Sequence, residues 1–136
     1  MYVIKTEIND PKRTVWNFAR QKTMYGGKNI AAGDTVFVFA SENEGGAGLI
    51  AKGIVASAEA VPRREGVERQ TPRVSIVVKR TGLAKCKLGR TELRPFNDWK
   101  DGQPETELNF KFYRQATNKI GGISNLTAAF LKGCVG

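Results

Sequence analysis

The chain of 136 residues has the length of one domain, and its 40% hydrophobic residues suffice for a single core. It contains no histidine, which excludes a Ser-His-Asp or Cys-His catalytic unit and a histidine-based metal site. Its net charge of +9 favours a polyanionic partner.

The remaining composition indicates an ordinary intracellular domain. No apolar run is long enough to cross a membrane, and the N-terminal residues lack the pattern of a secretory signal. The two cysteines, Cys86 and Cys134, are too few for a disulfide framework and form no CxxC pair. We therefore expect one cytoplasmic, reduced domain over residues 1–136, without a metal or another cofactor.

The first half of the chain predicts strands around one helix. Residues 2–8 are rich in strand-forming residues. Asp10 as an N-cap and Pro11 at the first helical position predict a helix to about Lys22 that buries Val15, Phe18 and Ala19. Residues 34–40 form a strand that is apolar on both faces and therefore central. Residues 48–61 predict another strand, in which Gly53 marks a bulge or a tight barrel corner.

The second half continues with a polar loop over 61–72 and a strand over 73–80. Weak strand character follows at 84–88, then one helical turn near Leu93 and an alternating strand over 108–115. A closing helix begins after Ser124 or Asn125, buries Leu126, Ala129 and Phe130, and ends at Gly133. Five or six strands without crossover helices predict an α+β fold, a mixed and mostly antiparallel β-barrel with two or three helices.

Basic residues are clustered along the chain. Residues 61–94 hold ten Lys/Arg against three acids, while 11–32 and 111–136 hold five and four Lys/Arg without an acid. A soluble basic surface would explain the excess, but the clustering fits a phosphate-binding face better. The candidate phosphate-binding residues are Arg63, Arg64, Arg73, Lys79, Arg80, Lys85, Lys87, Arg114 and Lys119.

Most aromatic residues read as core, including the strand-spaced pair Phe37 and Phe39. Trp16, Trp99, Tyr25 and Tyr113 instead lie among polar or basic neighbours, where a half-exposed ring suits base stacking. Polar clusters follow two of these rings and contain Asn17 and Asn118, whose amides can pair with a base edge.

The order of motifs in residues 1–61 resembles the EVE domain of the PUA-like superfamily, which also holds YTH and ASCH domains. The resemblance rests on a short V-x-N-aromatic motif, a Gly-Asp turn, a strand ending in Ser and a Gly-rich return strand. These positions are Val15, Asn17, Phe18, Gly33, Asp34, Ser41 and the run from Gly48 to Ser57.

The resemblance implies a compact mixed barrel with a cleft that binds RNA or accepts a flipped, often methylated base. Residues 41–48 would form a glycine-rich lip beside that cleft. Trp16, Phe39, Trp99 and Tyr113 would stack on the base. Its polar edge would be bound by Asn17, Ser41 and Asn118.

A small-molecule binder or a hydrolytic enzyme could use the same cleft. The acids would be Glu7, Asp34, Glu42, Glu44 or Asp98, and Lys28 or Lys119 would hold an anion. Asp34 fits a turn residue better. A flat slot beside a tryptophan would favour base binding, whereas a closed cavity with two converging carboxylates would favour catalysis. A protein-interaction role has no specific motif, and the sequence leaves RNA or DNA open.

Overall fold

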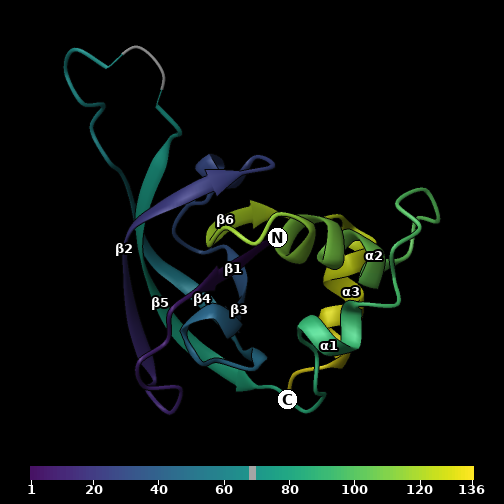
Figure 1. The fold of residues 1–136 in the computed structure, drawn as a ribbon. Coiled ribbons are helices and arrows are strands. Elements are labelled where there is room, and N and C mark those ends of the chain that lie inside the picture. Colours follow the sequence, from purple (N-terminus) through teal and green to yellow (C-terminus); the bar gives the residue numbers. More distant parts are fainter. Residues whose placement is uncertain (68–69) are drawn as a thin grey trace.

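The computed structural model describes residues 1–67 and 70–136, and in these residues six strands close into a barrel (Figure 1). The order around the barrel is β1-β3-β4-β5-β2-β6. The strands are β1 (Tyr2–Thr6), β2 (Val15–Met24), β3 (Thr35–Ala40), β4 (Gly48–Ala60), β5 (Arg73–Leu83) and β6 (Lys119–Gly122). Glu68 and Arg69, which belong to the charged residues counted over 61–94, lie outside the described residues.

The barrel is mixed, as expected. β1 pairs in parallel with β3, and β2 pairs in parallel with β6, while the other neighbours are antiparallel. The expected irregularity at Gly53 is confirmed, because the β4–β5 register shifts between Lys52 and Gly53. A side chain at Gly53 would meet Val78 of β5, so this corner requires glycine.

The helix expected from Asp10 to Lys22 is wrong, because Val15–Met24 is strand β2. Asp10 does accept a backbone hydrogen bond, from Lys12 N at 3.0 Å, but it closes a turn instead of capping a helix. Trp16 and Phe18 are two residues apart and enter the barrel together. Val15 and Ala19, which the helix would have buried, are exposed.

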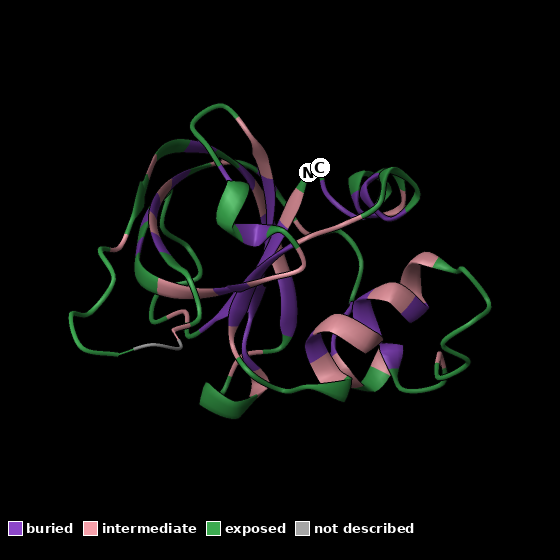
Figure 2. Cartoon of the chain, turned by 90° about the horizontal axis from the view of Figure 1, so that it is seen from above, coloured by how far each residue is buried: buried purple, intermediate pink, exposed green. Residues whose placement is uncertain are grey.

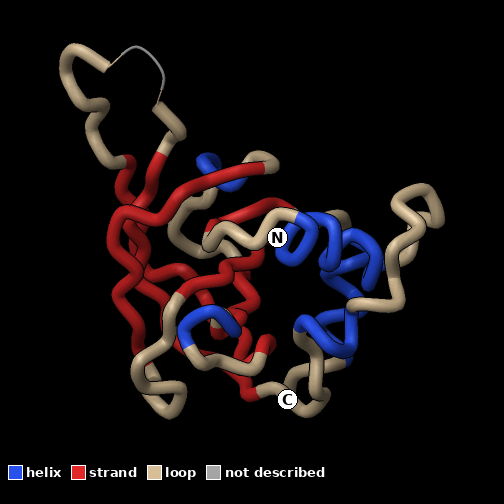
Figure 3. Tube along the Cα trace, viewed as in Figure 1, coloured by secondary structure: helices blue, strands red, loops and turns tan. Residues whose placement is uncertain are grey.

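Four helical segments gather on one side of the barrel (Figure 3). They are α1 (Arg90–Leu93), α2 (Pro104–Asn109), the π-helical turn η3 (Phe110–Arg114) and α3 (Asn125–Gly133). Two 3₁₀ turns, η1 (Gly27–Asn29) and η2 (Glu42–Glu44), lie on the barrel itself. The turn expected near Leu93 is confirmed as α1. No helix in the described part of the chain is long and apolar enough to cross a membrane.

The strand expected over 108–115 is also wrong, since α2 and η3 occupy these residues. Leu108 and Phe112 are fully buried and four residues apart, which places them on one helical face. Pro104 begins α2, where its fixed φ favours a helix. The spacing of Leu108, Phe110 and Phe112 fits the two-residue repeat of a strand, and the spacing of Leu108 and Phe112 also fits one turn of a helix. Pro104 is the local signal that favours the helix.

The closing helix α3 has the expected cap but another buried face. Ser124 Oγ accepts from Thr127 N at 3.2 Å, and the helix ends at Gly133. Thr127, Ala128 and Leu131 are buried. Leu126 and Ala129 are exposed and Phe130 is half-buried, so the expected face of these three residues is wrong.

Two apolar cores result, one inside the barrel and one between its outer wall and the helices (Figure 2). Along β3, Val36 and Val38 face the barrel interior, whereas Phe37 and Phe39 face the helices. This alternation explains why the strand is apolar on both faces, since the helices cover the outer wall.

Candidate nucleic-acid interface

An open recess of about 410 Å³ lies where β1 ends and β6 begins; we call it the mouth recess. Thr6 is the last residue of β1, residues 116–118 lead into β6, and η2 follows β3 at the same end of the barrel. Its lining residues are Thr6, Arg20, Gln21, Lys22, Asn43, Glu44, Arg73, Ala116, Thr117 and Asn118. Among the described residues that line it, three are cationic, one is acidic and none is aromatic.

Arg20 reaches the recess from a bulge in β2, where the β2–β5 register shifts between Phe18 and Gln21. Its φ is +52°, an unusual left-handed conformation for a residue other than glycine. Two bonds from β5 hold this backbone: Arg20 N donates to Ser75 Oγ at 2.9 Å, and Arg73 Nη1 donates to Arg20 O at 2.8 Å. Such strain is often stored at functional sites, and here it turns a basic residue toward the recess.

Asn118 lies in the recess with half of its amide satisfied. Its Nδ2 donates to Glu44 Oε1 at 3.1 Å, and because a carboxylate only accepts, this contact fixes the orientation of the amide. The buried Oδ1 has no hydrogen-bond partner among the described residues. The same holds for the hydroxyl of Ser41, which precedes η2 and is not one of the lining residues.

Two buried lysines, Lys5 and Lys119, bind backbone carbonyls of the segment that leads into the recess. Lys5 Nζ donates to Phe112 O at 2.6 Å and Ala116 O at 3.2 Å. Lys119 Nζ donates to Lys111 O and to Gln115 O, the latter at 2.9 Å. Both cations therefore satisfy the free carbonyls at the end of η3, and they fix the segment that leads to Asn118.

Burial lowers the pKa of both lysines, because it disfavours the charged form. For Lys119, the neighbouring cations Lys5 and Lys22 lower the pKa further, to about 8. For Lys5, Arg90 lowers the pKa, whereas the carboxylate of Glu42 raises it. This paired positive charge lies directly behind a recess that is already cationic.

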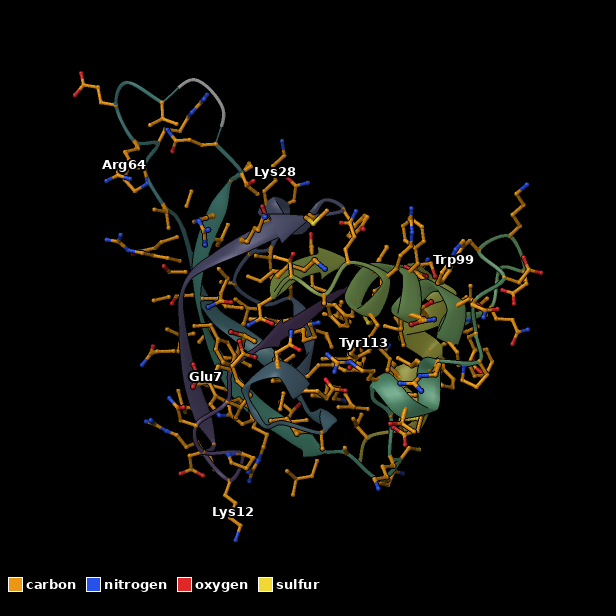
Figure 4. All side chains as sticks on the ribbon, in the orientation of Figure 1. Glu7, Lys12, Lys28, Arg64, Trp99 and Tyr113 are labelled. Carbon is orange, nitrogen blue, oxygen red and sulfur yellow. The ribbon has the colours of Figure 1, made fainter. Side chains whose placement is uncertain are left out.

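Tyr113 fixes η2 against the helices. Its hydroxyl donates to Glu42 at 2.9 Å from Oε2, and Arg90 N donates to the same oxygen at 2.6 Å. Burial raises the pKa of the Tyr113 hydroxyl, and the negative charge of Glu42 adds to this effect. Tyr113 points between the barrel and the helices (Figure 4). By holding Glu42, it positions η2, whose residues Asn43 and Glu44 line the recess.

A larger hollow of about 1310 Å³ runs from the recess along the β4–β5 hairpin; we call it the basic groove. Its basic lining residues are Arg20, Lys22, Lys28, Arg63, Arg64 and Arg73. Arg20, Lys22 and Arg73 also line the mouth recess, so the two hollows share these cations. Figure 4 shows Arg64 on the projecting hairpin and Lys28 near its base.

The structure does not gather the four expected stacking residues in one cleft. Trp16 faces the barrel interior and donates from Nε1 to Asp10 O at 3.1 Å, while Phe39 packs against Phe112 in the outer core. The Tyr113 hydroxyl is bound to Glu42, and Trp99 is 43% exposed on the helical side. Trp16 of β2 and Phe39 of β3 lie in different apolar cores. The expected cleft lined by all four aromatic residues is therefore wrong.

Of the three polar residues expected beside a base, the structure places one in the recess. Asn118 lines it, as stated. Asn17 is exposed on the outer face of β2, because it alternates with Trp16 and Phe18. Ser41 is buried beside the lip. Contact of any of them with a base stays a prediction.

The expected phosphate-binding residues divide into three groups. Arg63, Arg64 and Arg73 line the basic groove. Lys79, Arg80, Lys85, Lys87 and Arg114 are not among the lining residues of either hollow. Lys119 is fully buried, so its expected contact with a phosphate is wrong: its ammonium group is directed to carbonyls of the chain itself.

Arg20, Lys22 and Lys28 line the basic groove but are not among the expected phosphate-binding residues, although residues 11–32 contain five basic residues and no acid. The helix expected up to Lys22 gives no reason to place these residues together at one groove. Among the acids considered for catalysis, Asp34 accepts from Ala31 N at 2.8 Å and is a turn residue, as expected. Within residues 1–67 and 70–136, no cluster of His, Cys, Asp and Glu could hold a metal ion.

The closed mixed barrel, with helices on one outer face, confirms the compact mixed barrel that the resemblance implied, and solved structures share this fold. Residues along 97% of the chain superpose on the DUF55 domain of human thymocyte nuclear protein 1, with a TM-score of 0.65 at 14% identity and coverage of 96% of that chain.

Two further solved structures share the fold. A hypothetical protein from Leishmania major matches with a TM-score of 0.60 and 14% identity, over 97% of this chain and 91% of that chain. Human THYN1 protein in complex with 5-methylcytosine-containing DNA matches with a TM-score of 0.65 and 13% identity, over 97% and 95%. No family model and no curated protein matches the sequence.

Proposed function

We propose that this chain is a nucleic-acid-binding domain that takes one base, preferentially a modified one, into the mouth recess. The observation that carries the proposal is the sharing of Arg20, Lys22 and Arg73 between the recess and the basic groove. A phosphate backbone bound along the groove would thereby present a base to the recess. The shared fold with a protein solved on 5-methylcytosine DNA supports this reading.

The groove suits a nucleic-acid backbone because, among the described residues, it concentrates six Lys and Arg that three separate segments of the chain supply. Arginine forks and lysine ammonium groups bind phosphate oxygens and release counterions, which provides affinity without sequence preference.

The recess suits the polar edge of a base better than a fully apolar ligand. Asn118 Nδ2 gives one of its two N–H groups to Glu44, and the second N–H is a donor that a carbonyl or ring nitrogen of a base would accept. Because the described lining is not aromatic, a base would be bound there by its edge and by the surrounding cations. We propose DNA as the first substrate to test, with RNA as the alternative polymer.

The test is a binding titration with fluorescent oligonucleotides that carry cytosine or 5-methylcytosine, single- and double-stranded, as DNA and as RNA. Wild type should bind the 5-methylcytosine probe more tightly than the cytosine probe at fixed salt. Asn118→Ala should weaken binding of both probes several-fold, because one edge contact contributes about 1 kcal/mol and the two bases share the same polar edge. The matched control is Asn17→Ala, which removes an exposed amide outside the recess and should keep the affinity.

Two results would contradict the proposal. Wild type that binds no oligonucleotide at low salt excludes the function itself. Equal affinity of wild type and Asn118→Ala for both probes at fixed salt excludes the mouth recess as the place where the base is bound.

A further inference from the structure

Three aromatic rings form a continuous row on the helical side of the molecule. The ring centroids of Tyr25 and Phe110 are 6.4 Å apart, and those of Phe110 and Trp99 are 5.6 Å apart. Tyr25 and Phe110 are half-buried, and Trp99 is 43% exposed. A row of accessible rings joined from three separate segments is unusual for a surface loop and needs an explanation.

A guanidinium group lies beside two of the three rings. Arg114 Cζ lies 4.4 Å from the Phe110 centroid and 6.0 Å from the Trp99 centroid. The Arg114 side chain is exposed and makes no salt bridge with any residue of the described chain. Lys111 also lies over Tyr25, at 5.0 Å, but it is engaged by Glu107. Arg114 thus offers a cation beside flat apolar surfaces.

Residues of the row and Arg114 are close in sequence to residues that line both hollows of the proposed interface. Arg114 is two residues from Ala116, which lines the mouth recess. Tyr25 directly follows β2, and Lys28, three residues later, lines the basic groove. In Figure 4, Lys28 and Trp99 are both found along the upper side of the molecule. A strand that leaves the recess can therefore reach the rings.

We propose that Tyr25, Phe110 and Trp99, with Arg114, form a stacking platform for unpaired bases that flank the base in the mouth recess. This inference rests on the proposed function. Stacking on aromatic rings and guanidinium planes requires exposed base faces, which a single strand provides and an intact duplex does not. The platform would make single-stranded nucleic acid the preferred partner.

The acids near Trp99 define the side from which the strand approaches. Asp98 accepts from Lys100 N at 3.2 Å, and Asp101 accepts from Gln103 N at 3.0 Å, so both stabilise the turns of their own loop. Their charge would repel a phosphate. The backbone must therefore pass on the Arg114 side of the indole.

The first test compares three fluorescent probes that carry the same recognised base: a mononucleotide without flanking bases, a single-stranded 12-mer and a 12-base-pair duplex. Trp99→Ala should weaken binding of the single-stranded 12-mer by about tenfold and leave the other two probes unchanged. Arg114→Lys keeps the charge but loses the planar group, and should weaken the same probe selectively. Leu126→Ala, which truncates a 59% exposed side chain on α3, is the matched control.

A second readout is direct. The chain has two tryptophans, and Trp16 is only 5% exposed, so quenching of tryptophan fluorescence by added strand reports mainly on Trp99. The single-stranded 12-mer should quench wild type strongly and Trp99→Phe weakly.

The outcomes separate the two proposals. If wild type binds no probe, the proposed function fails and this inference fails with it. If wild type binds with dependence on Asn118 but Trp99→Ala changes no probe, the platform alone is wrong. Equal weakening of all three probes by Trp99→Ala would also overturn the platform, because flanking bases would then not be its target.

Discussion

Glycines in the loop between β3 and β4 show how single residues shape the rim of the recess. Gly45 and Gly48 have φ of +85° and +91°, which residues with a side chain rarely adopt. Around Gly45 there is open space, whereas a side chain at Gly48 would collide with the backbone of Leu88 and Gly89. The two positions therefore need glycine for partly different reasons: both for the backbone angle, and Gly48 also for close packing.

This pair gives a controlled prediction. Gly45→Ala should lower the free energy of unfolding by about 1–2 kcal/mol, the cost of a left-handed alanine. Gly48→Ala should lower it by at least ~1 kcal/mol more, since backbone must also move. Urea unfolding followed by circular dichroism measures both. Equal destabilisation by the two variants would show that the packing against residues 88–89 is absent.

Among the elements, the junction between the barrel and η3 depends on buried charge. Lys5 of β1 and Lys119 of β6 are paired across the antiparallel ladder, and both direct their ammonium groups to carbonyls at the end of η3. A second junction joins the helices: Glu107 Oε2 accepts from Lys111 Nζ at 2.8 Å, and Oε1 accepts from Ser124 Oγ at 2.6 Å. Polar contacts thus position the helical layer on the barrel wall.

The buried lysine predicts an alkaline dependence of stability. The pKa of Lys119 is lowered from 10.5 to about 8 in the folded chain, first by burial and then by Lys5 and Lys22. Between these values the unfolded chain keeps a proton that the folded chain has lost. Folding stability contributed by this group therefore rises with pH from about 8 to 10.5.

Urea titrations of wild type and Lys119→Met between pH 7 and 10.5 measure this effect. The difference in unfolding free energy should grow in favour of wild type as the pH rises. Lys132→Met, which changes an exposed residue of α3, is the control. An unchanged difference over this range, or the same trend in the control, would contradict the shifted pKa.

Across the whole molecule, the projecting β4–β5 hairpin and the helical layer lie on opposite sides of the barrel. The groove and the projecting hairpin carry arginines and lysines on one side, and the helices cover the outer wall on the other (Figures 1 and 4). With a net charge of +9, some affinity for any polyanion is expected. The salt dependence of binding distinguishes this general attraction from defined contacts in the groove.

A pair of double variants tests that distinction. Lys28→Gln with Arg64→Gln removes two groove cations and should reduce the slope of log K against log salt by about 1.4–1.8, depending on single or double strand. Lys79→Gln with Lys87→Gln removes two exposed cations outside both hollows and should change the slope little. Equal slopes for both variants would indicate that the whole surface, and not the groove, binds phosphate.

The sequence by itself determined the barrel and several of its boundaries. β3, β4 with its bulge at Gly53, β5 and the Ser124-capped helix were predictable, because apolar runs, glycine and caps act locally. The partial clustering of basic residues also indicated a polyanion, and Arg63, Arg64 and Arg73 do share the groove.

The tertiary structure alone decided where ambiguous segments and long side chains lie. Residues 15–24 fit a helix by their cap signals, yet pairing with β5 and β6 makes them a strand and turns Trp16 into the core. Lys119 reads as a surface cation, but its position opposite Lys5 directs it to the end of η3. The recess likewise joins residues from distant parts of the chain, and their meeting depends on the closure of the barrel, which no local pattern contains.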